Sequence, residues 1–176
     1  MIEVRKLSAT EGREHLAALA EVLTDCVEGG ASVSFMAPLS KSAAERFFES
    51  VLDEVEAGAR ILLAAFVDEK LVGTVQILTA TPPNQPHRAD VAKLLVSRSA
   101  RLHGVGTRLM QQVEEAARRA GKTLLVLDTV TGGSAERMYT RLGWTRVGVI
   151  PKYAMFPDGT WCDTTVFWKE IAMHYT

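Results

Sequence analysis

The sequence predicts a mixed α/β fold built from seven strands and four helices. Strand-like and helix-like patterns follow one another in the order strand, two helices, three strands, helix, strand, helix and two strands. The 176 residues, 47% of them hydrophobic and 23% charged, suffice for one domain with a substantial core. No repeat, linker or low-complexity tract divides the chain, so residues 1–176 are expected to form a single domain.

The first predicted elements are one strand and two helices. Residues 2–7 alternate between apolar and polar side chains, which predicts the strand. Apolar side chains recur at helical spacing over 16–27, and two glycines follow as a helix stop. Ser42 and Glu45 have the spacing of a capping box, so the second helix is expected to begin there and to end near Gly58.

Three strands and a longer helix are expected next, and another strand after them. The apolar runs over 60–67 and 71–80 predict a hairpin, because only three residues separate them. Residues 88–96 form the next strand pattern, and an amphipathic stripe over 107–120 predicts the helix. The nearly continuous apolar run over 123–130 predicts a strand that is buried on both faces. The order is completed by a helix over 134–142 and by strands over 145–150 and 164–171.

Composition and cysteine content exclude several classes of function. Lys and Arg number 20, and Asp and Glu 21, so the net charge of -1 gives no chain-wide attraction to nucleic acid or to a membrane. Cys26 and Cys162 lie far apart and fit neither a disulfide framework nor a zinc site, and the histidines show no metal-ligand spacing, so no metal is expected. The N-terminus has no signal-peptide pattern, and no apolar run reaches the roughly 20 residues of a membrane span. These features favour a reduced, cytoplasmic setting.

A glycine-rich loop, Arg101–Gly106, joins the strand pattern over 88–96 to the amphipathic helix. Such a turn points backbone N–H groups and a helix N-terminus at one place, which suits a phosphate. A dinucleotide fingerprint would need a third glycine where Leu109 stands, and no Gly-Lys-Ser/Thr sequence supplies a nucleotide P-loop. The pattern that remains is Arg-x-x-Gly-x-Gly. The alternative is a tight turn without a ligand.

The residues around this loop resemble those of a known family. The stretch "LLVSRSARLHGVGTRLM" resembles motif A of the GNAT N-acetyltransferases, and "AERMYTRLGW" resembles a second segment of that family. The resemblance implies a largely antiparallel seven-stranded sheet flanked by about four helices, with acetyl-CoA as co-substrate. It also implies that the loop amides hold the pyrophosphate and that the preceding strand binds the pantetheine arm and polarises the thioester carbonyl. The residues so assigned are Leu94, Leu95, Val96, Arg101, Leu102, His103, Gly104, Val105, Gly106, Thr107 and Ala135.

The second segment supplies a candidate acid and one departure from the family pattern. Tyr139 occupies the family's tyrosine position, and a phenol with an ordinary pKa of about 10 can return a proton to a leaving thiolate. The alternative is a tyrosine that only packs in the core. The family often has an asparagine where this chain has Gly132, so a pantetheine contact from that side chain is lost or moved.

Asp128 is the candidate base. It ends an otherwise apolar strand, at the edge where an α/β sheet usually opens towards its ligand. Partial burial would raise its pKa, and the carboxylate could then accept the proton of an ammonium group directly or through water. The alternative is a carboxylate that caps the turn running to Gly132. With both substrates held side by side, the acetyl group would pass directly, without a covalent enzyme intermediate.

Two groups of residues are candidates for the acceptor site. The resemblance assigns the segment after the first helix to one wall of this site and side chains of the late strands to the opposite wall. Arg88, Asp90 and Lys93 alternate along one strand and would bind a carboxylate and an amine, or simply face solvent. Packing at the rim is the alternative for the aromatic side chains. The wall candidates are Phe35, Met36, Tyr153, Trp161 and Asp163.

These assignments predict an N-acetyltransferase that moves an acetyl group from acetyl-CoA to the primary amine of a small, amino-acid-like acceptor. Four segments, in order, resemble a toxin-resistance branch of the family whose acceptor is a small β-lactam-bearing amino acid, so antibiotic or toxin resistance is one expected role. A peptide or protein N-acetyltransferase and a non-catalytic acetyl-CoA sensor are the alternatives. The chain is expected to act as a monomer or homodimer, with a small-molecule amine as partner and without nucleic acid or membrane.

Overall fold

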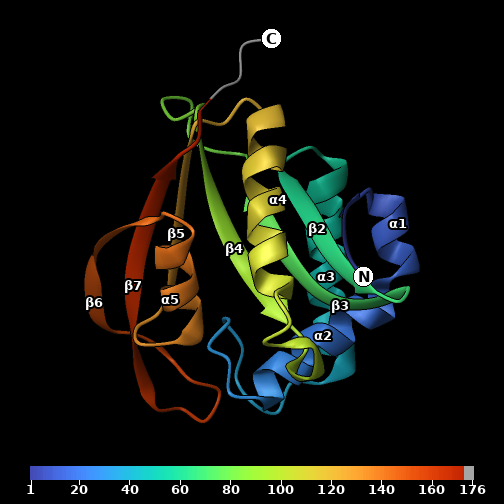
Figure 1. Ribbon diagram of the computed structural model, residues 1–176. Helices are drawn as coiled ribbons and strands as arrows, with labels where there is room; N and C mark the ends of the chain where they lie inside the picture. The colour runs from blue at the N-terminus through green and yellow to red at the C-terminus, as the bar shows by residue number, and fades with distance from the viewer. Residues whose placement is uncertain (173–176) are drawn as a thin grey trace.

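A seven-stranded sheet forms the centre of the computed structural model, which describes residues 1–172 (Figure 1). The strand order is β1-β2-β3-β4-β5-β7-β6, and every neighbouring pair is antiparallel except β4 and β5. In chain order the elements are β1 (Ile2–Leu7), α1 (Ala9–Glu14), α2 (Leu16–Glu28), α3 (Lys41–Glu56), β2 (Arg60–Val67), β3 (Lys70–Leu78), β4 (Arg88–Val96), the 3₁₀ turn η1 (Arg98–Ala100), α4 (Val105–Arg119), β5 (Leu124–Val130), α5 (Ser134–Arg141), β6 (Thr145–Met155) and β7 (Trp161–Glu170). The predicted class and the largely antiparallel seven-stranded sheet are confirmed.

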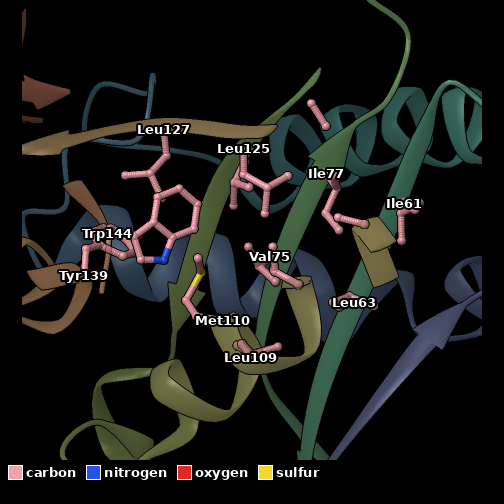
Figure 2. Packing of buried hydrophobic residues seen from close by; sticks show 14 of the residues in the cluster. Ile61, Leu63, Val75, Ile77, Leu109, Met110, Leu125, Leu127, Tyr139 and Trp144 are labelled. Carbon is pink, nitrogen blue, oxygen red and sulfur yellow. The ribbon is translucent and has the colours of Figure 1, made fainter. Parts of the chain in front are cut away.

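Helices cover both faces of the sheet and enclose two separate cores. The first core lies between the sheet and α4 with α5, where Leu109 and Met110 of α4 lie among Val75 and Leu125 of the strands (Figure 2). The second core lies between the sheet and α2 with α3, around the fully buried Phe48. Within residues 1–172, no helix combines the length and the apolar character needed to cross a membrane.

Two predictions at the N-terminal helices are wrong. An additional helix, α1, precedes α2, and its six residues are too few to show an apolar stripe. The signal that marks it is a capping box in which Ser8 and Glu11 exchange hydrogen bonds with each other's backbone. The cap of α3 is Ser40, whose hydroxyl accepts the amide of Ala43 at 3.2 Å, so Ser42 lies inside the first turn instead of opening the helix.

β5 is covered on one face only, so the predicted burial of both faces is wrong. Buried residues alternate with partly exposed ones along the strand, and Asp128 is exposed. The second core contains residues from β1 to β4 but none from β5, which leaves that face of β5 without a covering helix. The last two strands also run longer than predicted at their connecting turn, because β6 is largely exposed and lacks a buried face to set a periodicity.

β4 and β5 pair with each other over only three residues. Arg88 to Asp90 pair in parallel with Leu124 to Val126, and the ladder stops there, whereas β5 pairs with β7 along its whole length. Beyond that point β4 carries an irregularity against β3, and Lys93 has a φ of 54°, in the left-handed region that non-glycine residues rarely adopt. Residues 91–96 and 127–130 therefore border a gap in the middle of the sheet, called the opening below.

Candidate active site

The residues Leu102–Thr107, called the cradle below, lead into α4 with unpaired backbone amides. None of these amides has a hydrogen-bond acceptor among residues 1–172, and Gly104, the N-cap of α4, has no side chain with which to cap the helix. Gly104 has a φ of 84°, a conformation that favours glycine. Free N–H donors and the positive end of the dipole of a 15-residue helix therefore meet at one place, which suits a phosphate group.

The opening follows β4 towards the cradle. Beyond Asp90, the side of β4 that faces β5 has no strand partner within residues 1–172, so backbone groups of Leu94–Val96 on that side are available to an extended ligand, except the carbonyl oxygen of Val96, which accepts hydrogen bonds from side chains. Leu95 is buried in the second core, which fixes this part of the strand against α2 and α3. Free backbone amides at the end of an unpaired strand have the donors and the extended shape that suit a ligand with a phosphate group and an amide-bearing arm.

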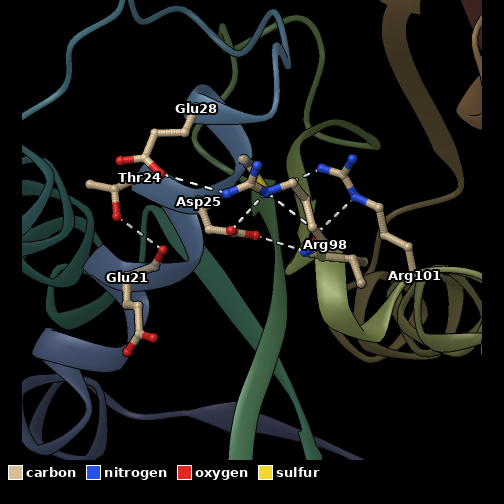
Figure 3. Close-up of polar contacts among 8 residues, drawn as sticks. Glu21, Thr24, Asp25, Glu28, Arg98 and Arg101 are labelled. Atoms are coloured by element: carbon tan, nitrogen blue, oxygen red, sulfur yellow. Dashed lines mark hydrogen bonds and ion pairs between the residues drawn. The ribbon is translucent and has the colours of Figure 1, made fainter.

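Arg101 holds the end of β4. Its Nε donates to the carbonyl oxygen of Val96 at 3.1 Å, and its Nη2 lies 3.8 Å from Cys26 Sγ (Figure 3). The guanidinium thus contacts β4 and α2.

Tyr139 lies on the face of α5 that packs into the first core. Its ring is buried in the first core, with centroids 5.9 Å from those of Trp144 and Phe167. Burial raises the pKa of the phenol well above its ordinary value, and the negative charge of Asp128 raises this pKa further. Tyr139 is therefore both a core residue and an electrostatic neighbour of Asp128, and it carries its proton at neutral pH.

Asp128 lies near the end of β5 with its carboxylate exposed, and not partly buried as predicted. The strand is uncovered on this face, so solvent reaches the side chain. Thr164 of β7 holds the carboxylate through its hydroxyl, whose Oγ1 is 2.7 Å from Asp128 Oδ2 and 3.0 Å from the carbonyl oxygen of Thr129. Asp128 thus has one fixed oxygen and one oxygen available for another donor.

Glu136, and not Asp128, caps the turn that follows β5. Its carboxylate accepts the backbone amide of Gly132 and, at 3.0 Å, the hydroxyl of Thr165. The amide of Gly132 is the main reason why the pKa of Glu136 is lowered. Because Glu136 fills this capping position, the alternative interpretation of Asp128 as a turn cap loses its support.

Lys93 faces the opening from the opposite strand. Its Nζ donates to Ser34 Oγ at 2.7 Å, which connects the β4 bulge to the loop between α2 and α3. Burial lowers the pKa of Lys93, and the nearby negative charge of Asp128 opposes this effect by favouring the charged ammonium. A positive and a negative side chain therefore lie on the two strands that border the opening.

The loop over 31–39, called the acceptor loop below, connects α2 to α3 and contacts the hairpin of β6 and β7. Ser32 Oγ donates to the carbonyl oxygen of Met155 at 2.7 Å. The backbone amide of Ala37 donates to the carbonyl oxygen of Pro157 at 3.1 Å. Phe35 packs edge-on against Phe47 of α3, at a centroid distance of 5.1 Å, so it anchors the loop. The other aromatic and apolar wall candidates are largely exposed: Met36, Tyr153 and Trp161.

Three of the predicted acceptor residues serve other contacts. Arg88 Nη1 pairs with Asp90 Oδ1 at 2.7 Å, next to the short β4–β5 ladder, so these two charges satisfy each other. Asp163 Oδ1 accepts the amide of Lys152 at 2.8 Å and thereby supports the irregular pairing of β6. Of the predicted charged acceptor residues, Lys93 alone borders the opening together with Asp128.

Several residues of the site carry no signal in the sequence. Ser34, Thr164 and Asp25 are ordinary polar residues in their local segments, and their importance comes from partners that are distant along the chain. The separations are 59 residues for Lys93 and Ser34, 36 for Thr164 and Asp128, and 73 for Asp25 and Arg98. Only the fold brings these pairs together.

Comparison with known proteins identifies the family. Residues 18–144 match the model of the acetyltransferase (GNAT) family. A protein from Azospirillum brasilense, described as an uncharacterized N-acetyltransferase in the hisH-hisA intergenic region, is 31% identical over 158 residues, which cover 88% of this chain and 89% of that protein. The chain belongs to the GNAT acetyltransferase family. It is therefore an N-acetyltransferase that takes its acetyl group from acetyl-CoA.

Solved structures of other acetyltransferases share the fold. An N-acetyltransferase from Staphylococcus aureus Mu50 superposes with a TM-score of 0.80 at 16% identity, covering 98% of this chain and 99% of that one. The proposed acetyltransferase yncA from Salmonella typhimurium, solved with its cofactor acetyl-CoA, gives 0.78 at 18% identity, with 99% and 96% covered. A ribosomal-protein-alanine N-acetyltransferase from Brucella melitensis gives 0.77 at 19%, with 96% and 99% covered. At identities of 16–19% these structures show a shared fold and do not identify the acceptor of this chain.

Proposed function

We propose that this GNAT enzyme transfers the acetyl group directly to the primary amine of a small, amino-acid-like acceptor in a ternary complex. The observation that carries the proposal is the pair of opposite charges at the opening, Asp128 on β5 and Lys93 on β4. A zwitterionic amino acid is complementary to this pair, because its carboxylate would meet Lys93 and its ammonium group would meet Asp128.

The donor half of the site is formed by the cradle and by β4. The amides of Leu102–Thr107 and the N-terminus of α4 would bind the pyrophosphate, and backbone groups of Leu94–Val96 would bind the pantetheine arm and polarise the carbonyl. Ala135 packs at the start of α5 against the first core and would line the arm. When bound, acetyl-CoA supplies an acetyl group activated as a thioester.

Asp128 and Tyr139 would handle the protons of the reaction. Asp128 takes one proton from the acceptor ammonium group, directly or through water, so that the nitrogen can form its bond to the acetyl carbon as the carbon–sulfur bond breaks. Tyr139 gives its proton to the departing sulfur, and the second proton of the nitrogen replaces it. Because the pKa of Tyr139 is raised, the phenol gives up this proton only while the sulfur leaves. Asp128 then releases its proton to solvent, which restores both groups.

The walls of the site support a small acceptor. Hydrogen bonds of Ser32 and Ala37 tie the acceptor loop to the hairpin of β6 and β7, and Ser34 ties it to β4, so the loop would form one wall beside a small acceptor. Four segments of the sequence also resemble the tabtoxin-resistance acetyltransferase, which acetylates an amino acid bearing a β-lactam. This resemblance supports an amino-acid-like acceptor and a role in resistance.

A screen of CoA release tests the proposal. The panel comprises free amino acids, β-lactam amino acids, aminoglycosides, polyamines and short peptides, each assayed with acetyl-CoA. We expect turnover with free amino acids or their β-lactam analogues, and a KM that rises about tenfold when the best acceptor is replaced by its methyl ester, which lacks the charge for Lys93. Turnover confined to peptides would favour a protein acetyltransferase. Binding of acetyl-CoA in calorimetry without CoA release over the whole panel would favour a non-catalytic sensor.

A further inference from the structure

The C-terminal turn of α2 is hydrogen-bonded to the segment that connects β4 to the cradle (Figure 3). Asp25 uses both carboxylate oxygens for one residue of that segment: Oδ2 accepts the backbone amide of Arg98 at 2.7 Å, and Oδ1 accepts its Nε at 2.8 Å. These hydrogen bonds and the positive charge of Arg98 hold the pKa of Asp25 below its ordinary value, although burial acts in the opposite direction. The contact is therefore made by a carboxylate that stays ionised at neutral pH.

A second contact from the same turn fixes the end of β4. The carbonyl oxygen of Val96 accepts the thiol of Cys26 at 3.4 Å and Nε of Arg101 at 3.1 Å. The segment between these points, η1, is a single 3₁₀ turn of three residues without a capping side chain. Such a short turn has little stability of its own, so its position depends on α2.

Gly29 shows that this contact shapes the end of α2. A side-chain carbon at Gly29 would lie 2.8 Å from Arg98 Cδ, closer than such atoms approach. The glycine thus leaves space for the Arg98 side chain to lie across the helix end, where it reaches Asp25. The same helix end continues into the acceptor loop, so one element contacts both halves of the site.

We propose that Asp25 is a positioning residue for acetyl-CoA, which holds the cradle through Arg98 in the geometry that binds the pyrophosphate. It does not touch either substrate. The inference rests on the assignment of the cradle to acetyl-CoA in the proposed function. Loss of the carboxylate would release η1 and disorder the amides that follow it, while Asp128 on β5 and Tyr139 on α5 would keep their places.

The test measures the Kd for acetyl-CoA by calorimetry and the steady-state constants of Asp25→Asn and Asp25→Ala. We expect the Kd and the KM for acetyl-CoA to rise about tenfold in Asp25→Asn, which retains an acceptor oxygen for Arg98, and further in Asp25→Ala. The kcat at saturating acetyl-CoA and the KM for the acceptor should change by no more than about twofold, which a general loss of folding would not produce.

Two further variants make the outcome specific. Gly29→Ala should raise the KM for acetyl-CoA in the same direction, because it crowds Arg98 without changing a charge. Glu28→Gln is the control, since Glu28 reaches the same arginine only at 3.6 Å and is 67% exposed, and its Kd should equal that of the wild type. An Asp25→Asn enzyme with wild-type Kd and KM for acetyl-CoA would overturn the role of Asp25. If Gly104→Asp in the cradle itself also leaves the Kd unchanged, the assignment of the cradle fails instead.

Discussion

Lys93 and Ser34 join β4 to the acceptor loop through one hydrogen bond, and both residues have left-handed backbones. The distance from Nζ to Oγ is 2.7 Å, and the φ angles are 54° and 75°. A non-glycine residue in this region costs about 1 to 3 kcal/mol, and such strain persists where the surrounding structure requires it. Here the β4 bulge directs Lys93 towards the opening, and the turn at Ser34 brings the acceptor loop to the ammonium group.

Replacement of Lys93 by methionine should weaken binding of acceptors that carry a carboxylate. We expect the KM for the best amino acid to rise about tenfold or more, with little change in the KM for acetyl-CoA, because only the acceptor's partner is lost. Lys70→Met is the matched control, since Lys70 is an exposed lysine at the start of β3. Equal KM values for an amino acid in Lys93→Met and the wild type would refute the assignment.

The acceptor KM should also depend on pH on the alkaline side. The pKa of Lys93 is lowered, so this lysine loses its positive charge at a lower pH than an ordinary lysine does. The KM for amino acids should therefore rise as the pH increases through this lowered pKa, and Lys93→Met should lack the rise. A pH profile of the acceptor KM that is the same in both enzymes would contradict this prediction.

Tyr139→Phe should lower kcat about 100-fold and leave the Kd for acetyl-CoA nearly unchanged. The ring contacts with Trp144 and Phe167 are retained, so folding is preserved. Because the pKa of Tyr139 is raised in the folded state, the wild type should lose stability as the pH rises above about 10, where only the unfolded chain releases this proton. The variant should lack this contribution in chemical denaturation at alkaline pH. Full activity in Tyr139→Phe would remove the phenol from the mechanism.

Asp128→Asn should reduce kcat/KM about 100-fold, because an amide cannot take the ammonium proton. Its kcat/KM should no longer fall on acidification in the way expected of the wild type. Thr164→Val provides a graded comparison, since it removes the hydroxyl 2.7 Å from Asp128 Oδ2 and leaves the carboxylate in place, with an expected loss of about tenfold or less. An unaltered pH–rate profile in Asp128→Asn would exclude Asp128 as the base.

Gly104→Asp should weaken acetyl-CoA binding about tenfold or more, because it places a negative charge at the cradle. Gly121→Asp is a close control at the other end of α4: both glycines have positive φ, 84° and 74°, and an added side chain has open space at both. Aspartate tolerates this backbone conformation better than most residues, so both variants should fold. Equal Kd values for the two variants would show that the cradle does not hold the phosphates.

The sequence alone predicts much of this molecule, and its errors have physical causes. Most strands and the longer helices follow from periodicity, because each presents a face to one of two cores, whereas the largely exposed β6 has no such face and was predicted too short. α1 was beyond that method, since six residues make no stripe, and Ser40 was missed as a cap beside the better-patterned Ser42. The exposure of Asp128 was also missed, because an apolar run does not reveal how far a helix layer extends over a sheet.

The candidate site likewise contains residues that the sequence predicts and residues that it does not. Asp128, Tyr139 and the cradle were predicted because a motif or a position at a strand end marks each of them. Ser34 and Asp25 were not predicted, since each acts through a partner more than 50 residues away. Local sequence patterns do not report such pairs, which become visible only in the packed fold.

The short pairing of β4 with β5 also bears on which unpaired strand groups another protein chain could reach. Unpaired strand groups normally occur at the outer edges of a sheet, where another chain can add a strand and start aggregation. Here unpaired groups also lie in the interior, with β3 on one side and β7 on the other. A slender extended ligand can reach these hydrogen-bonding groups. A strand that belongs to the sheet of another protein cannot. The fold thus leaves unpaired strand groups in a position that is accessible to a narrow ligand and shielded from the strands of other proteins.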